Sequence, residues 1–142
     1  MIIREAEMKD ASSLANLLGQ LGYPTSESSS QDKIKIYSGD GYKMLMGESD
    51  NKVIGFISLH WYISPHQPGY IGRITAFCMD ETVRSQGLGT LLLQAAEQFF
   101  KEIDCCKIEL TSNLKRSRTH HYYDKLGYEQ VSKHYVKFLK KR

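Results

Sequence analysis

The 142-residue sequence has few cysteines, few prolines and no long apolar run. Its three cysteines, Cys78, Cys105 and Cys106, are an odd count that argues against a disulfide framework. No Cys-x-x-Cys spacing accompanies the pair His120 and His121, so we expect no metal site. No apolar run approaches the ~20 residues of a membrane helix, and the first residues do not resemble a signal peptide. These absences predict a cytoplasmic protein without metal or membrane.

The sequence also has no large excess of charge of either sign. The formal net charge is +3, and the basic residues among positions 137–142 are most simply a solvated end of the chain. A nucleic-acid partner would need a clustered basic face, so none is predicted. A mild positive charge does suit an anionic cofactor.

The apolar patterns predict an α/β order of elements in one domain, residues 1–142. Asp10 is expected to cap a first helix, the serines at 28–30 a second, and Gly127 to end a fourth helix over 118–126. Strands are predicted over 2–5, 42–47, 53–62, 70–79, 107–111 and 128–138. The third helix begins near Gly87, and its predicted core face consists of Leu88, Leu91, Leu92, Ala95, Ala96, Phe99, Phe100 and Ile103. Hairpins followed by strand–helix–strand–helix–strand predict a mixed sheet around one right-handed crossover.

The segment 84–90, Arg-Ser-Gln-Gly-Leu-Gly-Thr, lies between a predicted strand and the third helix. Gly87 and Gly89 let a ligand approach the backbone, and the first amides of a helix form an electropositive anion site. The segment lacks the Lys-Ser/Thr ending of a Walker A loop and has one glycine too few for a dinucleotide fingerprint. Taken alone, it is equally consistent with a tight strand-to-helix turn.

Two motifs together resemble the GNAT family of acetyltransferases. Arg84-x-x-Gly87-x-Gly89 is similar to the family's pyrophosphate loop, and Tyr122-Tyr123-Asp124-Lys125-Leu126-Gly127-Tyr128 is similar to its later helix and strand. The detailed resemblance covers residues 71–128. Residues 111–116, with His120 and the strand segment Ser58-Leu59-His60, resemble a small-molecule subgroup that includes aminoalkylphosphonate N-acetyltransferases.

The resemblance implies a GNAT fold in which antiparallel N-terminal strands precede parallel, splayed fourth and fifth strands. It implies acetyl-CoA as cofactor and transfer of the acetyl group to the primary amine of a small molecule by direct attack. It places the pyrophosphate on the amides of 85–90 and the pantetheine arm beside the fourth strand. The cofactor-binding residues so implied are Phe77, Cys78, Met79, Arg84, Ser85, Gln86, Gly87, Leu88, Gly89, Thr90 and Asn113.

Tyr123 is the candidate catalytic acid for the leaving thiolate, because a phenol with a pKa near 10 is protonated at neutral pH. Its neighbour Tyr122 points about 100° away on a helix and is expected to pack instead. Either ring could also be an ordinary core aromatic.

The acceptor side is less defined. Many GNAT enzymes carry a glutamate that serves as general base at the position where this chain has Arg73. An arginine stays protonated and cannot take up a proton at neutral pH. On an ideal strand Arg73 shares a face with Thr75, Phe77 and Met79, and would then favour an acceptor with an anionic group. The alternative is a solvent-facing arginine. His60 is a candidate for the acceptor site and for deprotonation. His66 has the same expected position, and Lys115, Arg116 and Arg118 either meet the cofactor's ribose phosphate or form a solvated turn.

Three other functions remain open from the sequence: a non-catalytic acetyl-CoA-binding module, a protein N-acetyltransferase and, less favoured, a nucleic-acid module. The absence of an added docking segment disfavours the second. A homodimer is compatible with the sequence.

Overall fold

The computed structural model describes residues 1–111, 117–132 and 134–140, without the side chains of 117–119. The chain divides into two compact units, Met1–Thr111 and Ser112–Arg142.

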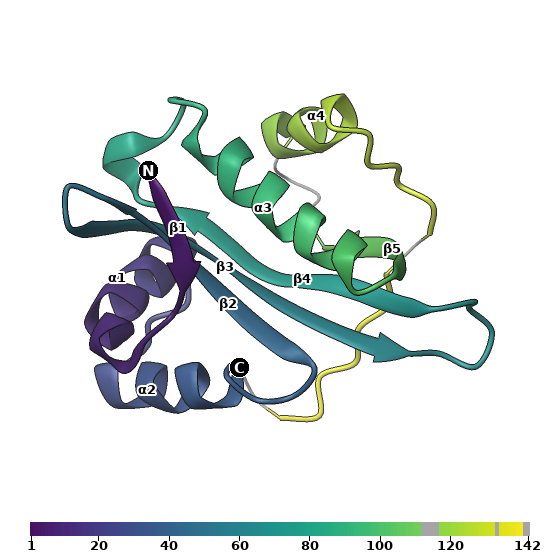
Figure 1. The fold of residues 1–142 in the computed structure, drawn as a ribbon, viewed down its shortest axis with the longest axis horizontal. Coiled ribbons are helices and arrows are strands. Elements are labelled where there is room, and N and C mark those ends of the chain that lie inside the picture. The colour runs from purple at the N-terminus through teal and green to yellow at the C-terminus, as the bar shows by residue number, and fades with distance from the viewer. Residues whose placement is uncertain (112–116, 133, 141–142) are drawn as a thin grey trace. The chain divides into compact units, whose positions relative to one another are not determined.

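The first unit is built on a five-stranded sheet in the order β1-β2-β3-β4-β5 (Figure 1). The strands are β1 (Ile2–Glu5), β2 (Tyr42–Ser49), β3 (Lys52–Ile63), β4 (Tyr70–Met79) and β5 (Cys105–Leu110). Neighbours from β1 to β4 are antiparallel, whereas β4 and β5 are parallel. The crossover that a parallel pair requires is α3 (Leu88–Glu102). The predicted mixed sheet is therefore confirmed.

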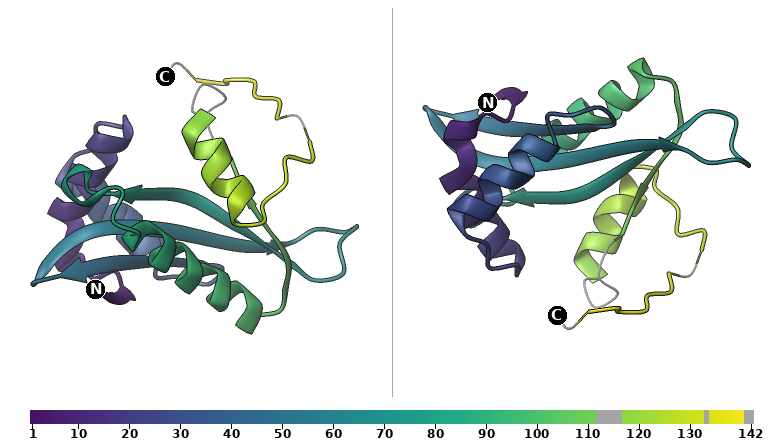
Figure 2. Two further views of the ribbon diagram at one scale, coloured as in Figure 1. Left: turned by 90° about the horizontal axis from the view of Figure 1, so that it is seen from above. Right: turned by 90° about the horizontal axis from the view of Figure 1, so that it is seen from below.

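Helices cover both faces of this sheet. The helices α1 (Ala11–Leu21) and α2 (Glu27–Ile36) lie on one face and α3 on the other (Figures 1 and 2). One core cluster lies under α1 and α2 and consists of Ala11, Leu14, Leu17, Ile34, Met44, Met46, Phe56 and Cys78. On the other face, α3 buries Leu92, Leu93, Ala96 and Phe100 completely.

The predicted core face of α3 is wrong in one respect. Leu91 is 49% exposed, whereas its neighbour Leu93 is fully buried. With leucines at 91, 92 and 93, the sequence is compatible with either Leu91 or Leu93 on the buried face of the helix. The sheet buries Leu93, which lies on the same helix face as Ala96 and Phe100.

Both predicted N-terminal caps differ in detail. Asp10 stands at the start of α1 in helical conformation, and its carboxylate accepts from the backbone N–H of Glu7 and from both terminal nitrogens of Arg4, at 2.8 and 2.9 Å. Burial, the largest single effect, would raise the pKa of Asp10, but the hydrogen bonds from Arg4 and the Glu7 amide and the nearby positive charges together outweigh it, so the pKa is lowered. In α2 the cap is Ser26, whose Oγ accepts from the Ser29 N–H at 3.0 Å, because the helix begins before the predicted serines.

The strand predicted over 128–138 is also wrong for the described residues. After α4 (Ser117–Lys125), residues 128–132 and 134–138 form no strand. Val131 and Tyr135 are more than 80% exposed. A β-prone segment becomes a strand only by pairing, so its composition alone did not suffice.

Within the part of the chain that the structure describes, no helix is both long and apolar enough to cross a membrane. Among the same residues, no three His, Cys, Asp or Glu side chains converge in a way that could hold a metal ion.

Candidate active site

The loop between β4 and α3 is held by the buried side chain of Asp80. Its Oδ1 accepts from the N–H and the hydroxyl of Thr82, at 2.9 and 2.6 Å, and its Oδ2 accepts from Gln20 at 3.2 Å. The Thr82 hydrogen bonds, first the hydroxyl and then the amide, lower the pKa of Asp80 to about 2. Gln20 also accepts from the Glu81 N–H, so α1 fixes the short helix η2 (Glu81–Val83) that precedes the loop.

The glycines of this loop bring the start of α3 against the end of β4. Gly87 has a φ of +79°, which a glycine adopts without strain, and it is the N-cap of α3. A Cβ on Gly89 would lie 3.2 Å from Met79 Cγ and 3.4 Å from Phe77 Cζ. Arg84 Nε donates to the Met79 carbonyl at 3.1 Å. The predicted loop and the predicted strand end are therefore in contact, and the helix start presents amides suited to an anion.

Beside the loop, β4 runs on past the end of β5. Their ladder joins residues 70–74 of β4 to residues 105–110 of β5, while β4 continues to Met79. Residues 75–79 of β4 lie outside that ladder, and among the described residues no strand pairs with them on this side, so their backbone groups there can pair with an extended ligand. The predicted positions Phe77, Cys78 and Met79 all belong to this stretch.

A β-bulge at Thr75 changes which side chains share a face. Ser58 pairs with Ala76 and Leu59 with Ile74, so Thr75 is the extra residue. Phe77 and Met79 point toward α3, whereas Thr75 points to the α2 side. The prediction that Thr75 and Phe77 share a face is therefore wrong, because it assumed an ideal strand.

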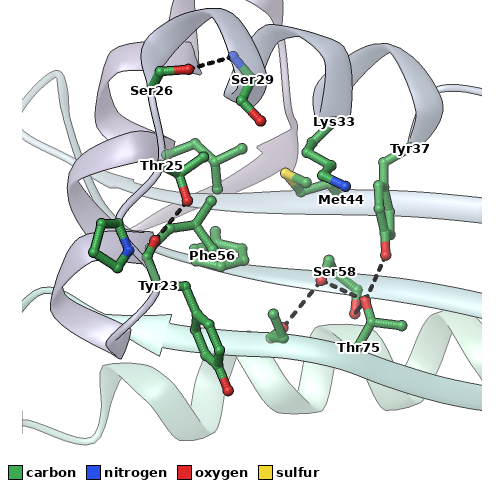
Figure 3. A pocket seen from close by; sticks show the side chains of 14 residues that line it. Tyr23, Thr25, Ser26, Ser29, Lys33, Tyr37, Met44, Phe56, Ser58 and Thr75 are labelled. Atoms are coloured by element: carbon green, nitrogen blue, oxygen red, sulfur yellow. Dashed lines mark hydrogen bonds between the residues drawn. The ribbon is translucent and has the colours of Figure 1, made fainter. Parts of the chain in front are cut away.

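A pocket of about 500 Å³ opens on the α1 and α2 side of this bulge (Figure 3). We call it the hydroxyl pocket. Its floor is apolar, and Lys33 is the one charged side chain among the described residues that line it. The hydroxyl groups around it belong to Tyr23, Thr25, Ser26, Ser29, Tyr37, Ser58 and Thr75. Its volume suits a small molecule.

Three of these hydroxyls converge on the bulge. Tyr37 Oη lies 2.9 Å from Thr75 Oγ1, and Ser58 Oγ lies 2.6 Å from the same atom (Figure 3). Thr75 Oγ1 in turn donates to the Ser58 carbonyl at 3.1 Å. The sequence did not predict this cluster of three hydroxyl groups. Ser58 carried a signal, since it is the one polar residue within the otherwise apolar run 53–59.

The predicted acceptor residues lie on the same sheet face, beyond the bulge. His60 pairs with Arg73 across β3 and β4, and Arg73 donates to Thr111 Oγ1 at 2.7 Å. Next to them, the Tyr62 hydroxyl donates to Glu109 at 3.1 Å. His66 lies in the loop after β3 with Nδ1 2.9 Å from Ser64 Oγ, and is not part of this group.

The second unit contains the predicted acid. Tyr123 on α4 contacts the rings of Tyr122 and Tyr128 edge-on, with centroids 5.4 and 5.6 Å apart. Burial, with a smaller effect of Tyr122, raises the pKa of Tyr123 to about 12. The phenol is therefore protonated at neutral pH, as an acid requires. The predicted Asn113, Lys115 and Arg116 and the side chain of Arg118 lie outside the described residues.

A parallel strand pair in which β4 runs past the end of β5, beside a helix that starts at a glycine, is an α/β arrangement suited to an extended anionic ligand. Comparison with known proteins gives the class. The chain matches the acetyltransferase (GNAT) family over residues 9–128, and it belongs to that family.

Individual relatives agree with this. The chain is 32% identical over 90 residues to an aminoalkylphosphonate N-acetyltransferase of Salmonella typhimurium, a match that spans 63% of this chain and 58% of that relative. A GNAT family acetyltransferase of Staphylococcus aureus is 27% identical with a TM-score of 0.82, over 97% of this chain and 98% of the other. An aminoglycoside N-acetyltransferase in complex with CoA shares the fold, with a TM-score of 0.82 at 16% identity over 99% and 94% of the two chains.

Proposed function

We propose that this protein is an acetyl-CoA-dependent N-acetyltransferase that acetylates the primary amine of a small molecule by direct attack. One observation carries the proposal: β4 runs on past the end of β5 beside the Gly87–Gly89 turn, so strand backbone outside the β4–β5 ladder and helix amides lie together. The family and the CoA-bound structural relative support the choice of cofactor.

The residues present fit acetyl-CoA. The amides of 85–90 and the Arg84 guanidinium would hold the pyrophosphate, and the backbone of residues 77–79 would pair with the pantetheine arm. The bound cofactor supplies an activated acetyl group. A backbone N–H of the free stretch of β4 would polarise its carbonyl as an oxyanion-hole donor does.

Direct attack is supported by the two faces of β4. Phe77 and Met79 point to the α3 side, while Thr75 and Ala76 line the hydroxyl pocket on the other. Successive strand residues are only about 3.3 Å apart, so an amine in the pocket and a thioester beside the strand can meet. Cys78 is buried in the core, with Sγ 3.5 Å from the Leu17 carbonyl, where it is poorly placed to carry an acetyl group.

The decisive experiment is coenzyme A release from acetyl-CoA with a panel of acceptors: small amines, aminoalkylphosphonates, polyamines and peptides. We expect turnover with one or more of the small amines, and product with the acetyl group on nitrogen by mass spectrometry. Acetyl-CoA binding without turnover on any acceptor would instead support a non-catalytic binding module. Turnover with peptides alone would support a protein N-acetyltransferase.

A homodimer and a cytoplasmic location remain predictions. Light scattering of the purified protein measures the first, and fractionation of the source cells measures the second.

A further inference from the structure

His60 lies between two tyrosine rings on the sheet face beside the hydroxyl pocket. Its ring is stacked on Tyr42, with centroids 4.3 Å apart and planes at 19°, and on Tyr62, with centroids 5.5 Å apart and planes at 21°. Its Nδ1 lies 2.8 Å from the Gly41 carbonyl oxygen. Three contacts therefore fix the orientation of this imidazole.

The Gly41 contact determines the tautomer. A carbonyl oxygen only accepts hydrogen bonds, so Nδ1 carries the proton and the neutral ring has its lone pair on Nε2. Among the described residues, His60 Nε2 has no hydrogen-bond partner. Protonation of Nε2 leaves the Nδ1–H donor unchanged. The ring can therefore gain and lose a proton without breaking its anchoring contact.

The groups around His60 do not occupy that nitrogen. Arg73, its partner on β4, donates to Thr111, and Glu109 on β5 accepts from Tyr62. The titratable or charged residues next to His60 are Tyr42 and Tyr62, whose rings stack on it, and Arg73, its partner on β4, while Glu109 lies one contact further out at the Tyr62 hydroxyl. His60 is the one histidine among these residues of the first unit.

The hydroxyl pocket adjoins this cluster through Tyr37. The Tyr37 ring contacts Tyr42 edge-on with centroids 5.0 Å apart, and Tyr42 stacks on His60. The Tyr37 hydroxyl reaches Thr75 at the bulge. One tyrosine thus forms a wall of the pocket and borders the histidine stack.

We propose that His60 is the general base of the reaction. This inference rests on the proposed function. Nε2 takes a proton from the acceptor's ammonium group, which leaves a neutral amine and an imidazolium. The amine nitrogen then bonds to the thioester carbon, the carbon–sulfur bond breaks, and the second proton lost by that nitrogen ends on the sulfur of coenzyme A. The imidazolium returns its proton to solvent.

The test is His60→Asn, because the Asn amide can still donate to the Gly41 carbonyl but cannot take up a proton near neutral pH. We expect kcat/KM for an alkylamine acceptor to fall by about 10²–10³-fold at pH 7, the scale of a lost positioned base. The acid limb of the pH profile should disappear, while acetyl-CoA affinity stays the same.

A matched substrate separates catalysis from structure. An alkoxyamine analogue of the acceptor is already neutral at pH 7 and needs no base, so His60→Asn should acetylate it at close to the wild-type rate. Equal losses with both acceptors would overturn the base role, and so would an unchanged pH profile for the alkylamine. If His60→Asn does not fold, His60→Gln is measured in the same way. No coenzyme A release by the wild type with any acceptor would overturn the proposed function together with this base, whereas the other failures overturn the base alone.

Discussion

The two glycines of the loop differ in what a side chain would meet. A Cβ on Gly87 has nothing within 4 Å but requires the left-handed backbone at φ +79°. A Cβ on Gly89 would press on Met79 and Phe77. A substitution of Gly87 should therefore affect mainly ligand binding, whereas a substitution of Gly89 should affect both packing and ligand binding.

Gly87→Ala should weaken acetyl-CoA binding about tenfold or more, because the new methyl group would lie where we propose that the pyrophosphate binds. The backbone strain should also cost about 1 kcal/mol of unfolding free energy. Gly22→Ala is the matched control, since Gly22 is also left-handed, at φ +104°, and also has open space around it. Calorimetry should find weaker acetyl-CoA binding for Gly87→Ala alone. Equal affinities for the two variants would contradict the loop assignment.

Tyr123→Phe keeps the ring and removes the proton. Because the pKa of Tyr123 is raised to about 12, the wild-type phenol keeps its proton throughout an assay from pH 6 to 10. We expect kcat to fall by roughly 10²–10⁴-fold with little change in acetyl-CoA affinity. Tyr122→Phe should behave like the wild type in the same steady-state assay. The reverse order of the two variants would show that the acid is Tyr122.

Arg73 forms no ion pair among the described residues, and its guanidinium donates a hydrogen bond to the neutral Thr111. Its charge is therefore available to an anionic acceptor. Arg73→Ala should raise KM for an aminoalkylphosphonate more than KM for acetyl-CoA, and Arg73→Lys should restore part of the difference. A wild-type preference for spermidine-like polycations would contradict an anionic acceptor.

At the scale of elements, the turn after β4 depends on one buried carboxylate. Asp80 is bonded to the hydroxyl and amide of Thr82 and to Gln20, so the turn and α1 are tied together. These bonds are stronger to the ionised carboxylate than to the protonated acid. The lowered pKa of Asp80 therefore means that its ionised side chain contributes to the free energy of unfolding.

Asp80 should stabilise the fold above pH 4 and lose that effect as the pH falls toward 2. The native pKa of about 2 is below the ordinary 3.8, so the unfolded chain takes up the proton first and acid favours unfolding. This difference in pKa corresponds to about 2 kcal/mol of unfolding free energy at neutral pH. Urea unfolding of the wild type and Asp80→Asn should show a difference in free energy that shrinks between pH 5 and 2.5. A constant difference would mean that Asp80 acts without its charge.

At the scale of the whole molecule, each helix face is selected by the sheet beneath it. Leu91 and Leu93 are the same residue type on the same helix, yet one is 49% exposed and the other fully buried. Phe100 is also fully buried, and a Cβ on Gly72 would lie 2.7 Å from its ring. Close contact between α3 and β4 therefore sets which leucine is inside.

Leu93→Ala should lower the unfolding free energy by about 2–5 kcal/mol, because it leaves a cavity between α3 and the sheet. Leu91→Ala should cost less than about 1 kcal/mol, since its side chain is half in solvent. Chemical denaturation of the two variants measures both. Similar losses would indicate that the helix is rotated relative to the structure.

The sequence by itself determined the order of the elements in the first unit, the hairpin of the strands predicted over 42–47 and 53–62, and the loop at Gly87. These depend on local chemistry: the period of the apolar residues, turn residues with positive φ and the glycines that permit a tight helix start. The motif was therefore sufficient to indicate the GNAT family.

Only the tertiary structure decided the bulge at Thr75, the hydroxyl pocket and the stacked position of His60. The bulge depends on the register between two strands, which reverses the face of every later side chain. The pocket joins residues of α1 and α2 to residues of β2, β3 and β4, and the tautomer of His60 depends on a carbonyl nineteen positions away. Contacts between residues this far apart in the chain leave no periodic pattern in the sequence, and they form only when the strands and helices pack.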